Sequence, residues 1–320
     1  MSSWWVGGYG ADMGGVMPGI QAMRSTDAGT LALVGTAVET PSPSYLLSRG
    51  EHLDAVAEGA GTVEAFRRTG EHTLERVGSV PSGGRWPCNL EFFDGGIAVA
   101  NYFDGIVGLV SDSTLVESVQ LEGSGPHERQ QGPHAHTVLA VDDETLLSVD
   151  LGADRVNVHG RGLAVVASVP LPPGTGPRDL TRHPSGFYYL LSELSHELFV
   201  LRWTGTTLDI VSSVAVPGAV AGDSDSAISV WGDYVYTGLR GSNRIAMLRS
   251  VDAGARLEPL GWVSSEGQWP RHHTVDGDVL HVANQVSSSV ASFRLGADGV
   301  PSLIAEPTAV PSPNYLLRAD

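Results

Sequence analysis

The chain has 320 residues, of which 42% are hydrophobic, so it contains enough apolar material for the core of one large domain. Its 40 glycines and its low charged fraction of 17% are typical of many tight turns and short strands rather than of long, salt-bridged helices. The formal net charge of −17, with 19 arginines and no lysine, disfavours nucleic acids and anionic membranes as partners, and no apolar run is long enough to span a bilayer.

Cys88 is the only cysteine, which excludes an internal disulfide and a metal site built from several cysteines. The first residues lack a basic segment followed by an apolar stretch, which is the pattern of a secretory signal. A cytoplasmic location is therefore expected.

Short segments of alternating polarity begin near the N-terminus. Residues 5–9, 19–23 and 31–34 have the pattern of the second, third and fourth strands of a four-stranded unit. A turn and a first strand follow at residues 40–47, with the sequence TPSPSYLL, and residues 310–317 nearly copy them as VPSPNYLL. The end of the chain therefore supplies the first strand that the beginning lacks.

Between these two segments, a polar or proline-containing turn followed by a short apolar strand recurs every 43 to 47 residues. The turns are marked by Pro43, Pro87, Pro133, Pro177, Ser224, Pro270 and Pro313. Internal repetition at such a period is the signature of a repeat architecture.

A second series lies in phase with the first, one hairpin further along each repeat. Its members are residues 55–58, 98–102, 147–150, 190–193, 235–240 and 281–285. Each ends in a Gly, Asp or Ser turn, and an alternating strand follows, as at residues 62–66. Period-two alternation predicts strands with one buried face, and no segment has a helical period.

Four short strands in about 45 residues form one blade of a β-propeller. The sequence therefore predicts an all-β, seven-bladed β-propeller with four antiparallel strands per blade, in a single domain over residues 1–320. The last blade is expected to be closed by one C-terminal and three N-terminal strands. Because a closed ring has no open sheet edge, a monomer is expected.

In such a blade the first strand begins on the face where the second strand ends, so both sets of residues face one mouth of the central channel. At the first-strand starts lie Ser42, Ser44, Trp86, His134, His136, Arg178, Asp223, Asp225, Arg271 and Asn314. At the second-strand ends lie Tyr9, Glu58, Asn101, Tyr102, Asp150, Glu193, Arg240, Asn284 and Gln285. The alternative to a functional site is that these polar residues are simply solvated.

Three arginines from different blades, Arg178, Arg240 and Arg271, favour a functional site in a chain of net charge −17. Guanidinium groups pair with carboxylates and phosphates through two parallel hydrogen bonds, so their convergence predicts an anionic small-molecule ligand. Taken singly, each arginine can instead form a structural pair with a nearby carboxylate. We expect at most one of His134 and His136 to face the channel.

Neither a metal nor a cofactor is expected. Glu58, Asp150 and Glu193 offer oxygen ligands for a hard cation such as Ca²⁺, but no compact ligand loop accompanies them. The sequence also has no Gly-x-Ser-x-Gly elbow for a nucleophilic serine and no Cys-x-x-Cys-His haem attachment.

Short motifs occur in a constant order around the repeats: VGGY at residues 6–9, PSYL at 43–46, VANY at 99–102, RQ at 129–130, PHAH at 133–136, DLGAD at 150–154, GPR at 176–178, HP at 183–184, SEL at 192–194, LRG at 239–241, PR at 270–271 and ANQ at 283–285. On these motifs the chain resembles, nearly end to end, the seven-bladed propeller lactonase family. That family includes propeller-type bacterial 6-phosphogluconolactonases and fungal carboxymuconate lactonising enzymes. The chain departs from the family pattern at Asp179, where a histidine is usual, and at Ala57, where an asparagine is common.

The resemblance implies a catalytic group of one histidine, two arginines and one glutamate, which falls on His134, Arg178, Glu193 and Arg240. In that reading His134 or Glu193 activates water, and an arginine stabilises the oxyanion. Further rim residues are expected to bind the substrate, namely Arg271, Tyr9, Glu58, Tyr102, His136, Asp150 and Gln285. The expected activity is hydrolysis of an anionic sugar lactone such as 6-phosphogluconolactone, in carbohydrate metabolism.

Two alternatives stay open. The same groups serve a carboxymuconate-type lactonising cycloisomerase, in which arginines bind the carboxylates and His134 or Glu193 delivers a proton. A propeller can also bind a ligand or a protein without catalysis, although such a scaffold has no need of the four-residue group at the rim.

Overall fold

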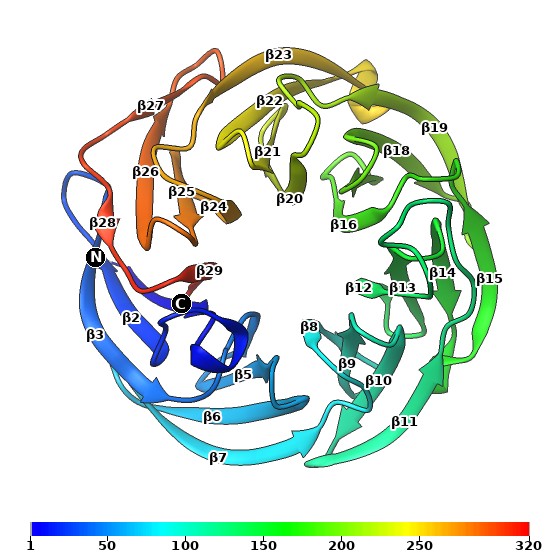
Figure 1. Cartoon of the computed structure of the whole chain (residues 1–320), viewed down its shortest axis with the longest axis horizontal. Coiled ribbons are helices and arrows are strands. Elements are labelled where there is room, and N and C mark those ends of the chain that lie inside the picture. Colours follow the sequence, from blue (N-terminus) through cyan, green and yellow to red (C-terminus); the bar gives the residue numbers. More distant parts are fainter. Residues whose placement is uncertain (1, 320) are drawn as a thin grey trace.

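Short strands joined by tight turns dominate the structure, and second strands such as β1 (Ser3–Gly8) and β25 (Val279–Asn284) are buried on both faces rather than on one. The computed structural model describes residues 2–319, which form seven sheets arranged in a ring (Figure 1). Each sheet is an antiparallel meander whose first strand lies innermost and whose last strand lies on the rim. The predicted all-β, seven-bladed β-propeller is confirmed.

Four blades follow one another from the first complete repeat. Blade 1 consists of β4 (Leu46–Arg49), β5 (His52–Ala57), β6 (Thr62–Gly70) and β7 (Thr73–Pro81). Blade 2 consists of β8 (Pro87–Phe93), β9 (Gly96–Asn101), β10 (Ile106–Ser111) and β11 (Thr114–Gln120). Blade 3 consists of β12 (Ala135–Asp142), β13 (Thr145–Asp150), β14 (Arg155–His159) and β15 (Val165–Pro170). Blade 4 consists of β16 (Pro177–Arg182), β17 (Phe187–Ser192), β18 (Glu197–Trp203) and β19 (Leu208–Ala215).

Three further blades complete the ring. Blade 5 consists of β20 (Ser224–Trp231), β21 (Tyr234–Arg240), β22 (Arg244–Val251) and β23 (Arg256–Ser264). Blade 6 consists of β24 (Pro270–Asp276), β25 (Val279–Asn284), β26 (Ser289–Leu295) and an outer edge divided into β27 (Pro301–Leu303) and β28 (Thr308–Ala309). Blade 7 consists of β29 (Pro313–Arg318), β1 (Ser3–Gly8), β2 (Gly19–Ser25) and β3 (Leu31–Glu39).

Blade 7 joins the two ends of the chain. The innermost strand β29 pairs with β1, so that Trp5 lies opposite Leu317 and Val6 opposite Leu316. In Figure 1 the red C-terminal strand lies beside the blue N-terminal strands. This pairing confirms closure by one C-terminal and three N-terminal strands.

Apolar side chains fill the interfaces between neighbouring blades. At the closure, Trp5 of blade 7 packs in one buried cluster with Leu46 and Phe66 of blade 1. Burying one side chain of this size contributes about 1.5–3 kcal/mol. The alternate residues that face the next blade therefore hold the ring together.

The innermost strands share one irregularity, a β-bulge near their first residue. In β8, β12, β16, β24 and β29, a single residue is inserted between two that pair with consecutive positions of the neighbouring strand. The inserted residues are Cys88, His136, Arg178, Arg271 and Asn314, and in β20 the shift covers Ser226 and Ala227. A bulge bends a strand and re-aims one side chain. Each of these blades therefore has one residue outside the regular strand pairing, and blade 5 has two.

The strand pairing also corrects the repeat markers of two blades. Pro87 and Pro177 each lie opposite the last residue of the second strand, but in blade 3 Ala135, not Pro133, lies opposite Asp150. In blade 5 the residue that precedes the bulge is Asp225, one position after the predicted marker Ser224. The connection into β12 is thus two residues longer than the repeat spacing suggests.

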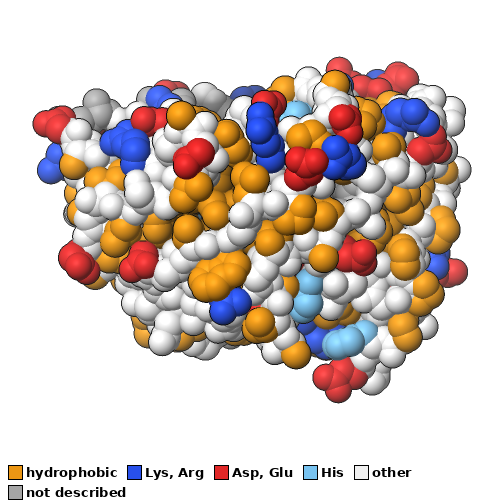
Figure 2. Space-filling model, turned by 90° about the horizontal axis from the view of Figure 1, so that it is seen from above, with side chains coloured by type: hydrophobic (Ala, Val, Ile, Leu, Met, Phe, Trp, Pro, Cys, Tyr) orange, Lys and Arg blue, Asp and Glu red, His pale blue; other side chains and the backbone are white. Residues whose placement is uncertain are grey.

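The outer strands of six blades are bulged too. In each of these strands one aliphatic residue falls between paired positions and has an exposed fraction of at least 40%. These residues are Val34, Val77, Val116, Val166, Val211 and Leu260. Figure 2 shows the rim edge-on, with apolar side chains spread across it.

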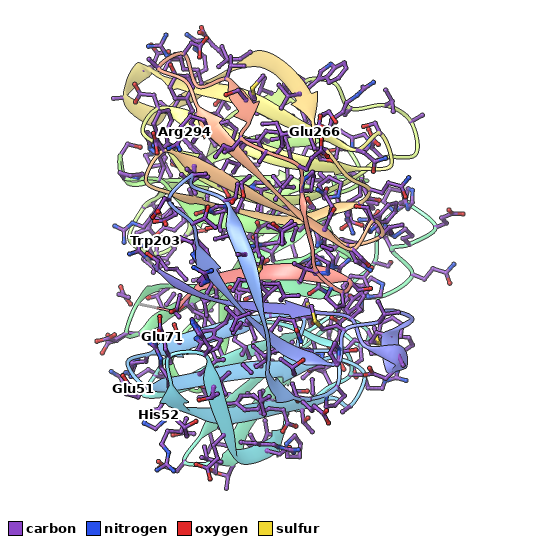
Figure 3. The ribbon with its side chains drawn as sticks, turned by 90° about the vertical axis from the view of Figure 1, so that its left-hand side faces the viewer. Glu51, His52, Glu71, Trp203, Glu266 and Arg294 are labelled. Atoms are coloured by element: carbon purple, nitrogen blue, oxygen red, sulfur yellow. The ribbon has the colours of Figure 1, made fainter. Side chains whose placement is uncertain are left out.

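The two faces of the disc carry different connections. His52, at the β4–β5 hairpin, and Glu71, at the β6–β7 hairpin, lie toward one face in Figure 3. The second-strand ends and the links between blades lie on the opposite face, because neighbouring strands are antiparallel. Within residues 2–319 the helical segments are the three-residue turns η1 (Ala11–Met13), η2 (Arg161–Leu163) and η3 (Asp252–Gly254), and none is long and apolar enough to cross a membrane.

Candidate active site

Two rings of side chains face the channel near one mouth. The lower ring consists of the bulge residues and their counterpart in blade 1, and all line one hollow: Ser44, Cys88, His136, Arg178, Ser226, Arg271 and Asn314. The upper ring comes from the second-strand ends, where Tyr9, Glu58, Tyr102, Glu193 and Arg240 line a cavity. Because Glu58, Cys88, His136, Arg178 and Arg271 line both hollows, they form one continuous site.

The turn before the first strand has an unusual backbone conformation in several blades, and this turn positions the lower-ring residues. The residue before the first-strand proline adopts left-handed backbone at Trp86 (φ 56°), Gly176 (φ 56°) and Trp269 (φ 65°). A Cβ at Gly176 would clash with the side chain of Leu194, which explains glycine there. A tryptophan in this conformation is costly, and such strain is typical of residues at functional sites.

Glu193 lies at the centre of an arginine cluster. Its Oε1 accepts a hydrogen bond from Nη2 of Arg129 at 2.5 Å, and its Oε2 lies 2.8 Å from Nη2 of Arg240 and 3.2 Å from Nη1 of Arg178. Burial alone would raise the pKa of Glu193, but the three guanidinium groups outweigh burial and hold that pKa well below its usual range. Glu193 is therefore a fixed negative charge.

The backbone of β20 orients two of these arginines. Arg178 donates from Nε to the carbonyl of Ser226 at 2.7 Å. Arg240 donates from Nε to the carbonyl of Ser224 at 3.1 Å and from Nη2 to that of Asp225 at 2.9 Å. Burial lowers the pKa of Arg240 to about 9, although Glu193 acts in the opposite direction. The guanidinium groups are thus held in place before any ligand arrives, as electrostatic stabilisation requires.

Arg271 differs from the other cavity arginines because no carboxylate of the described chain lies within 4.0 Å of it. Its Nη2 donates to the hydroxyl of Tyr9 at 2.6 Å, and its guanidinium lies 4.8 Å from the centre of the Tyr9 ring. Within the cavity, four arginines face only Glu58 and Glu193. The site therefore carries excess positive charge even when both carboxylates are ionised, in a protein whose net charge is −17.

His136 is the imidazole that lies beside this cluster. Its Nε2 lies 2.7 Å from Nη1 of Arg178. Because a guanidinium can only donate, Nε2 must be the acceptor, so Nδ1 carries the proton of the neutral ring. Burial and the charge of Arg178 hold the pKa of His136 well below its usual range. Nδ1 is buried without a hydrogen-bond partner among the described residues, so its N–H group can donate to a bound ligand.

Glu58 is the second carboxylate of the cavity. Its Oε1 accepts a hydrogen bond from the hydroxyl of Tyr9 at 2.9 Å, and its Oε2 accepts one from the hydroxyl of Ser44. Burial raises the pKa of Glu58, and Arg271 and the two hydroxyls only partly offset this effect. The two carboxylates thus have opposite electrostatic surroundings.

The structure places three of the expected site residues, His134, Asp150 and Gln285, outside the cavity. The ring of His134 stacks on Tyr102 with centroids 4.7 Å apart, and its Nδ1 lies 2.8 Å from the Tyr102 carbonyl. The reason is the longer connection into β12, which puts His136 rather than His134 at the bulge. The imidazole that contacts Arg178 is therefore His136.

Asp150 and Gln285 also lie outside the cavity, for different reasons. Asp150, the last residue of β13, does not line the cavity; its Oδ1 accepts backbone N–H groups of His134, Gly152 and Ala153 at 2.8–3.1 Å. It holds a turn. Gln285 occupies an upper-ring position in blade 6, but it does not line the cavity. Tyr9, Glu58, Tyr102 and Arg271 lie in the cavity with Arg178, Glu193 and Arg240.

Arg129 is a charged cavity residue that the repeat pattern did not point to. It lies in the loop before β12, outside both series of strand positions, and reaches both Glu193 and the hydroxyl of Tyr102 at 3.4 Å. The neighbouring Gln130 anchors this loop by donating to the carbonyl of Leu151 at 2.8 Å. The RQ motif at residues 129–130 was the available signal.

Asp179, which departs from the family pattern, has a structural role. Its Oδ1 accepts from the backbone N–H of Leu180 at 3.0 Å, and its Oδ2 accepts from that of Ile228 at 2.9 Å, which joins blades 4 and 5. Residues 2–319 contain no group of three or more carboxylate, imidazole or thiol side chains placed to hold a metal ion.

Comparison with known proteins assigns the family. The sequence pattern described as "Lactonase, 7-bladed beta-propeller" matches residues 3–317. The chain belongs to this lactonase family. A 6-phosphogluconolactonase of Bacillus subtilis (strain 168) is 30% identical over 284 residues, which cover 80% of each chain.

Solved structures agree with this family assignment. The Pseudomonas aeruginosa periplasmic gluconolactonase PpgL is 27% identical, with a TM-score of 0.89, and the match covers 99% of this chain and 98% of that one. A Lactobacillus plantarum protein is 25% identical with a TM-score of 0.91, covering 100% of this chain and 99% of that one. Together with the family match, these relatives support a lactonase-type enzyme.

Proposed function

We propose that this lactonase-family protein hydrolyses a lactone that carries an anionic group, such as a phosphorylated sugar lactone. The observation that carries the proposal is the excess positive charge of the cavity, with Arg271 lacking a carboxylate partner within 4.0 Å among the described residues. A guanidinium in this state pairs strongly with a phosphate or carboxylate. The Bacillus subtilis relative, named 6-phosphogluconolactonase, supports a phosphorylated substrate.

The chemistry starts with attack of water on the lactone carbonyl. A carbon–oxygen bond forms, and the carbonyl oxygen becomes an oxyanion. Donors for this charge are the protonated Nδ1 of His136, which has no partner among the described residues, and the guanidinium of Arg178, which lines the same cavity. Each preorganised donor of this kind typically contributes about 3–4 kcal/mol. The ring carbon–oxygen bond then breaks, and the ring oxygen takes up a proton to give the hydroxy acid.

Glu193 and His134 are weak candidates for the proton acceptor. Three arginines hold Glu193 as an anion of low proton affinity, and His134 lies outside the cavity. In this proposal Glu193 keeps the arginine cluster assembled, and Arg271 holds the anionic group of the substrate.

A stopped-flow pH-indicator assay tests the proposal. Fresh 6-phosphogluconolactone and unphosphorylated gluconolactone are compared, both corrected for spontaneous opening. We expect the phosphorylated lactone to be favoured, and we expect Arg271→Gln to lower its kcat/KM about 10- to 100-fold while changing the neutral lactone little. Arg67→Gln, in an exposed ion pair with Glu75, serves as the matched control.

Two outcomes would overturn the proposal. Equal acceleration of both lactones, unaffected by Arg271→Gln, would remove the anion-binding role of this residue. Acceleration of neither lactone, with turnover of a carboxymuconate instead, would replace hydrolysis with lactonising cycloisomerisation.

A further inference from the structure

The two carboxylates of the cavity differ in what surrounds them. Glu193 contacts three guanidinium groups. Glu58 forms no ion pair within 4.0 Å in the described chain, and its partners are the hydroxyls of Tyr9 and Ser44. When two titratable groups in one site are placed in opposite surroundings, they are suited to different tasks in acid–base chemistry.

Glu58 is rigidly held and faces the reacting space. It directly follows β5, and its backbone N–H donates to the carbonyl of Ser42 at 3.2 Å. Only 4% of the residue is exposed, yet it lines both the upper cavity and the lower hollow. It therefore sits at the level where a lactone held between the two rings would lie.

The hydrogen-bond directions leave Glu58 as an acceptor. Arg271 donates to the Tyr9 hydroxyl, so the proton of that hydroxyl is free to point at Oε1 of Glu58. Ser44 donates to Oε2 in the same way. A carboxylate has about four lone-pair positions, so each oxygen can still accept a proton from a bound water.

We propose that Glu58 is the general base of the hydrolysis, an inference that rests on the proposed function. As the water oxygen bonds to the lactone carbon, its O–H bond breaks and the proton passes to Glu58. When the ring carbon–oxygen bond breaks, the ring oxygen takes that proton from Glu58. The carboxylate is regenerated, and no further reactant is needed.

The charges around Glu58 suit this task. The groups that face it are Tyr9, Ser44, Cys88, Arg178 and Arg271, from five different blades. Burial raises the pKa of Glu58 while the arginines and hydroxyls restrain the rise. A base is most effective when its pKa approaches the working pH, and Glu58 is shifted in that direction while Glu193 is shifted away from it.

The test compares Glu58→Gln and Glu58→Asp in the full chain. The matched control is Glu64→Gln, because Glu64 is an equally buried carboxylate of the same blade that pairs with Arg76 outside the cavity. We expect Glu58→Gln to lower kcat about 10²- to 10⁴-fold with little change in KM, and to abolish the acidic limb of the pH–rate profile. We expect Glu58→Asp to retain part of the rate, and the control to behave as the wild type.

The proposal is overturned if the acidic limb persists in Glu58→Gln, or if the loss appears only in KM. A separate readout distinguishes this failure from failure of the proposed function. Infrared difference titration of the wild type against Glu58→Gln measures a carboxyl band without any substrate. We expect a band that titrates above the ordinary glutamate range and is missing from the variant; its absence from the wild type would overturn the assignment even in an active enzyme.

Discussion

Nη1 of Arg178 lies 2.7 Å from Nε2 of His136, and this contact determines which nitrogen of the imidazole carries the proton. Because arginine supplies only donors, His136 must accept at Nε2 and donate at Nδ1. The ring is thereby a neutral hydrogen-bond donor rather than a base.

This relationship predicts the tautomer and charge of His136 in solution. Burial and Arg178 lower its pKa, so the ring stays neutral, with the proton on Nδ1, across the neutral pH range. ¹⁵N NMR of labelled histidine, assigned with His136→Gln, measures both properties. An imidazolium signal for His136 at pH 7, or a neutral ring protonated on Nε2, would contradict the contact.

The arginines that contact Glu193 should differ in how much each contributes to the stability of the fold. Arg178 is buried and ties blade 4 to the carbonyl of Ser226, so Arg178→Ala should destabilise the fold by about 3 kcal/mol as well as remove activity. The side chain of Arg129 is 38% exposed, so Arg129→Ala should change stability by less than about 1 kcal/mol while lowering kcat/KM about 100-fold. Denaturant unfolding and steady-state kinetics measure the two effects, and equal destabilisation by both variants would argue against this division.

Glu58→Gln should stabilise the fold while it impairs turnover. The folded-state pKa of Glu58 is raised, so above that pKa the ionised, buried carboxylate costs stability that a neutral amide does not. Glutamine can accept from Tyr9, and its amide can donate to Ser44 once the serine hydroxyl turns. We expect a gain of about 1 kcal/mol in the free energy of unfolding at pH 8. A loss of stability would show that the carboxylate is needed for packing.

His281 should make the fold sensitive to acid. Burial lowers its pKa to about 4, whereas in the unfolded chain the value is near 6.5. The unfolded state therefore binds the proton first as the pH falls, and stability is lost between about pH 6.5 and 4. Relative to His281→Asn, the wild type should lose about 3 kcal/mol over this range. Parallel stability curves for the two proteins would contradict the assignment.

The bulged outer strands predict a monomer, because a bulge disrupts the regular edge that another sheet needs for pairing. Light scattering after size-exclusion chromatography should give the mass of one chain. Ser212 and Ile210 lie opposite the consecutive residues Val200 and Leu201 of β18, so deleting Val211 would remove the inserted residue and straighten this edge. We expect that variant to self-associate, whereas Val211→Thr, which keeps the bulge, should not. A dimeric wild type would contradict the prediction.

The architecture could be predicted from the sequence because the blade period recurs around the whole ring and both ends supply parts of one blade. A repeat of this kind tolerates small errors in each blade without changing the fold. The near-identity of residues 40–47 and 310–317 identified the closing strand directly. The innermost strand β29 confirms that reading.

The site was less predictable because it depends on single-residue register. The longer connection into β12 moved the channel-facing histidine from His134 to His136. At the end of β13 the side chain of Asp150 binds backbone N–H groups and does not line the cavity, and only the tertiary structure reveals this placement. Arg129 belongs to a loop that has no counterpart in the strand pattern, so only the RQ motif pointed to this loop, and its contact with Glu193 became visible in the tertiary structure.

The inner bulges also bear on how such an enzyme can change during evolution. Because Cys88, Ser226 and Asn314 stand outside the strand ladder, another side chain at any of these positions leaves the pairing that holds its blade intact. Mutation can therefore alter ligand preference one blade at a time, while the apolar interfaces continue to support the ring. These three bulge positions, unlike the linked arginines around Glu193, can vary nearly independently, a property that suits directed evolution.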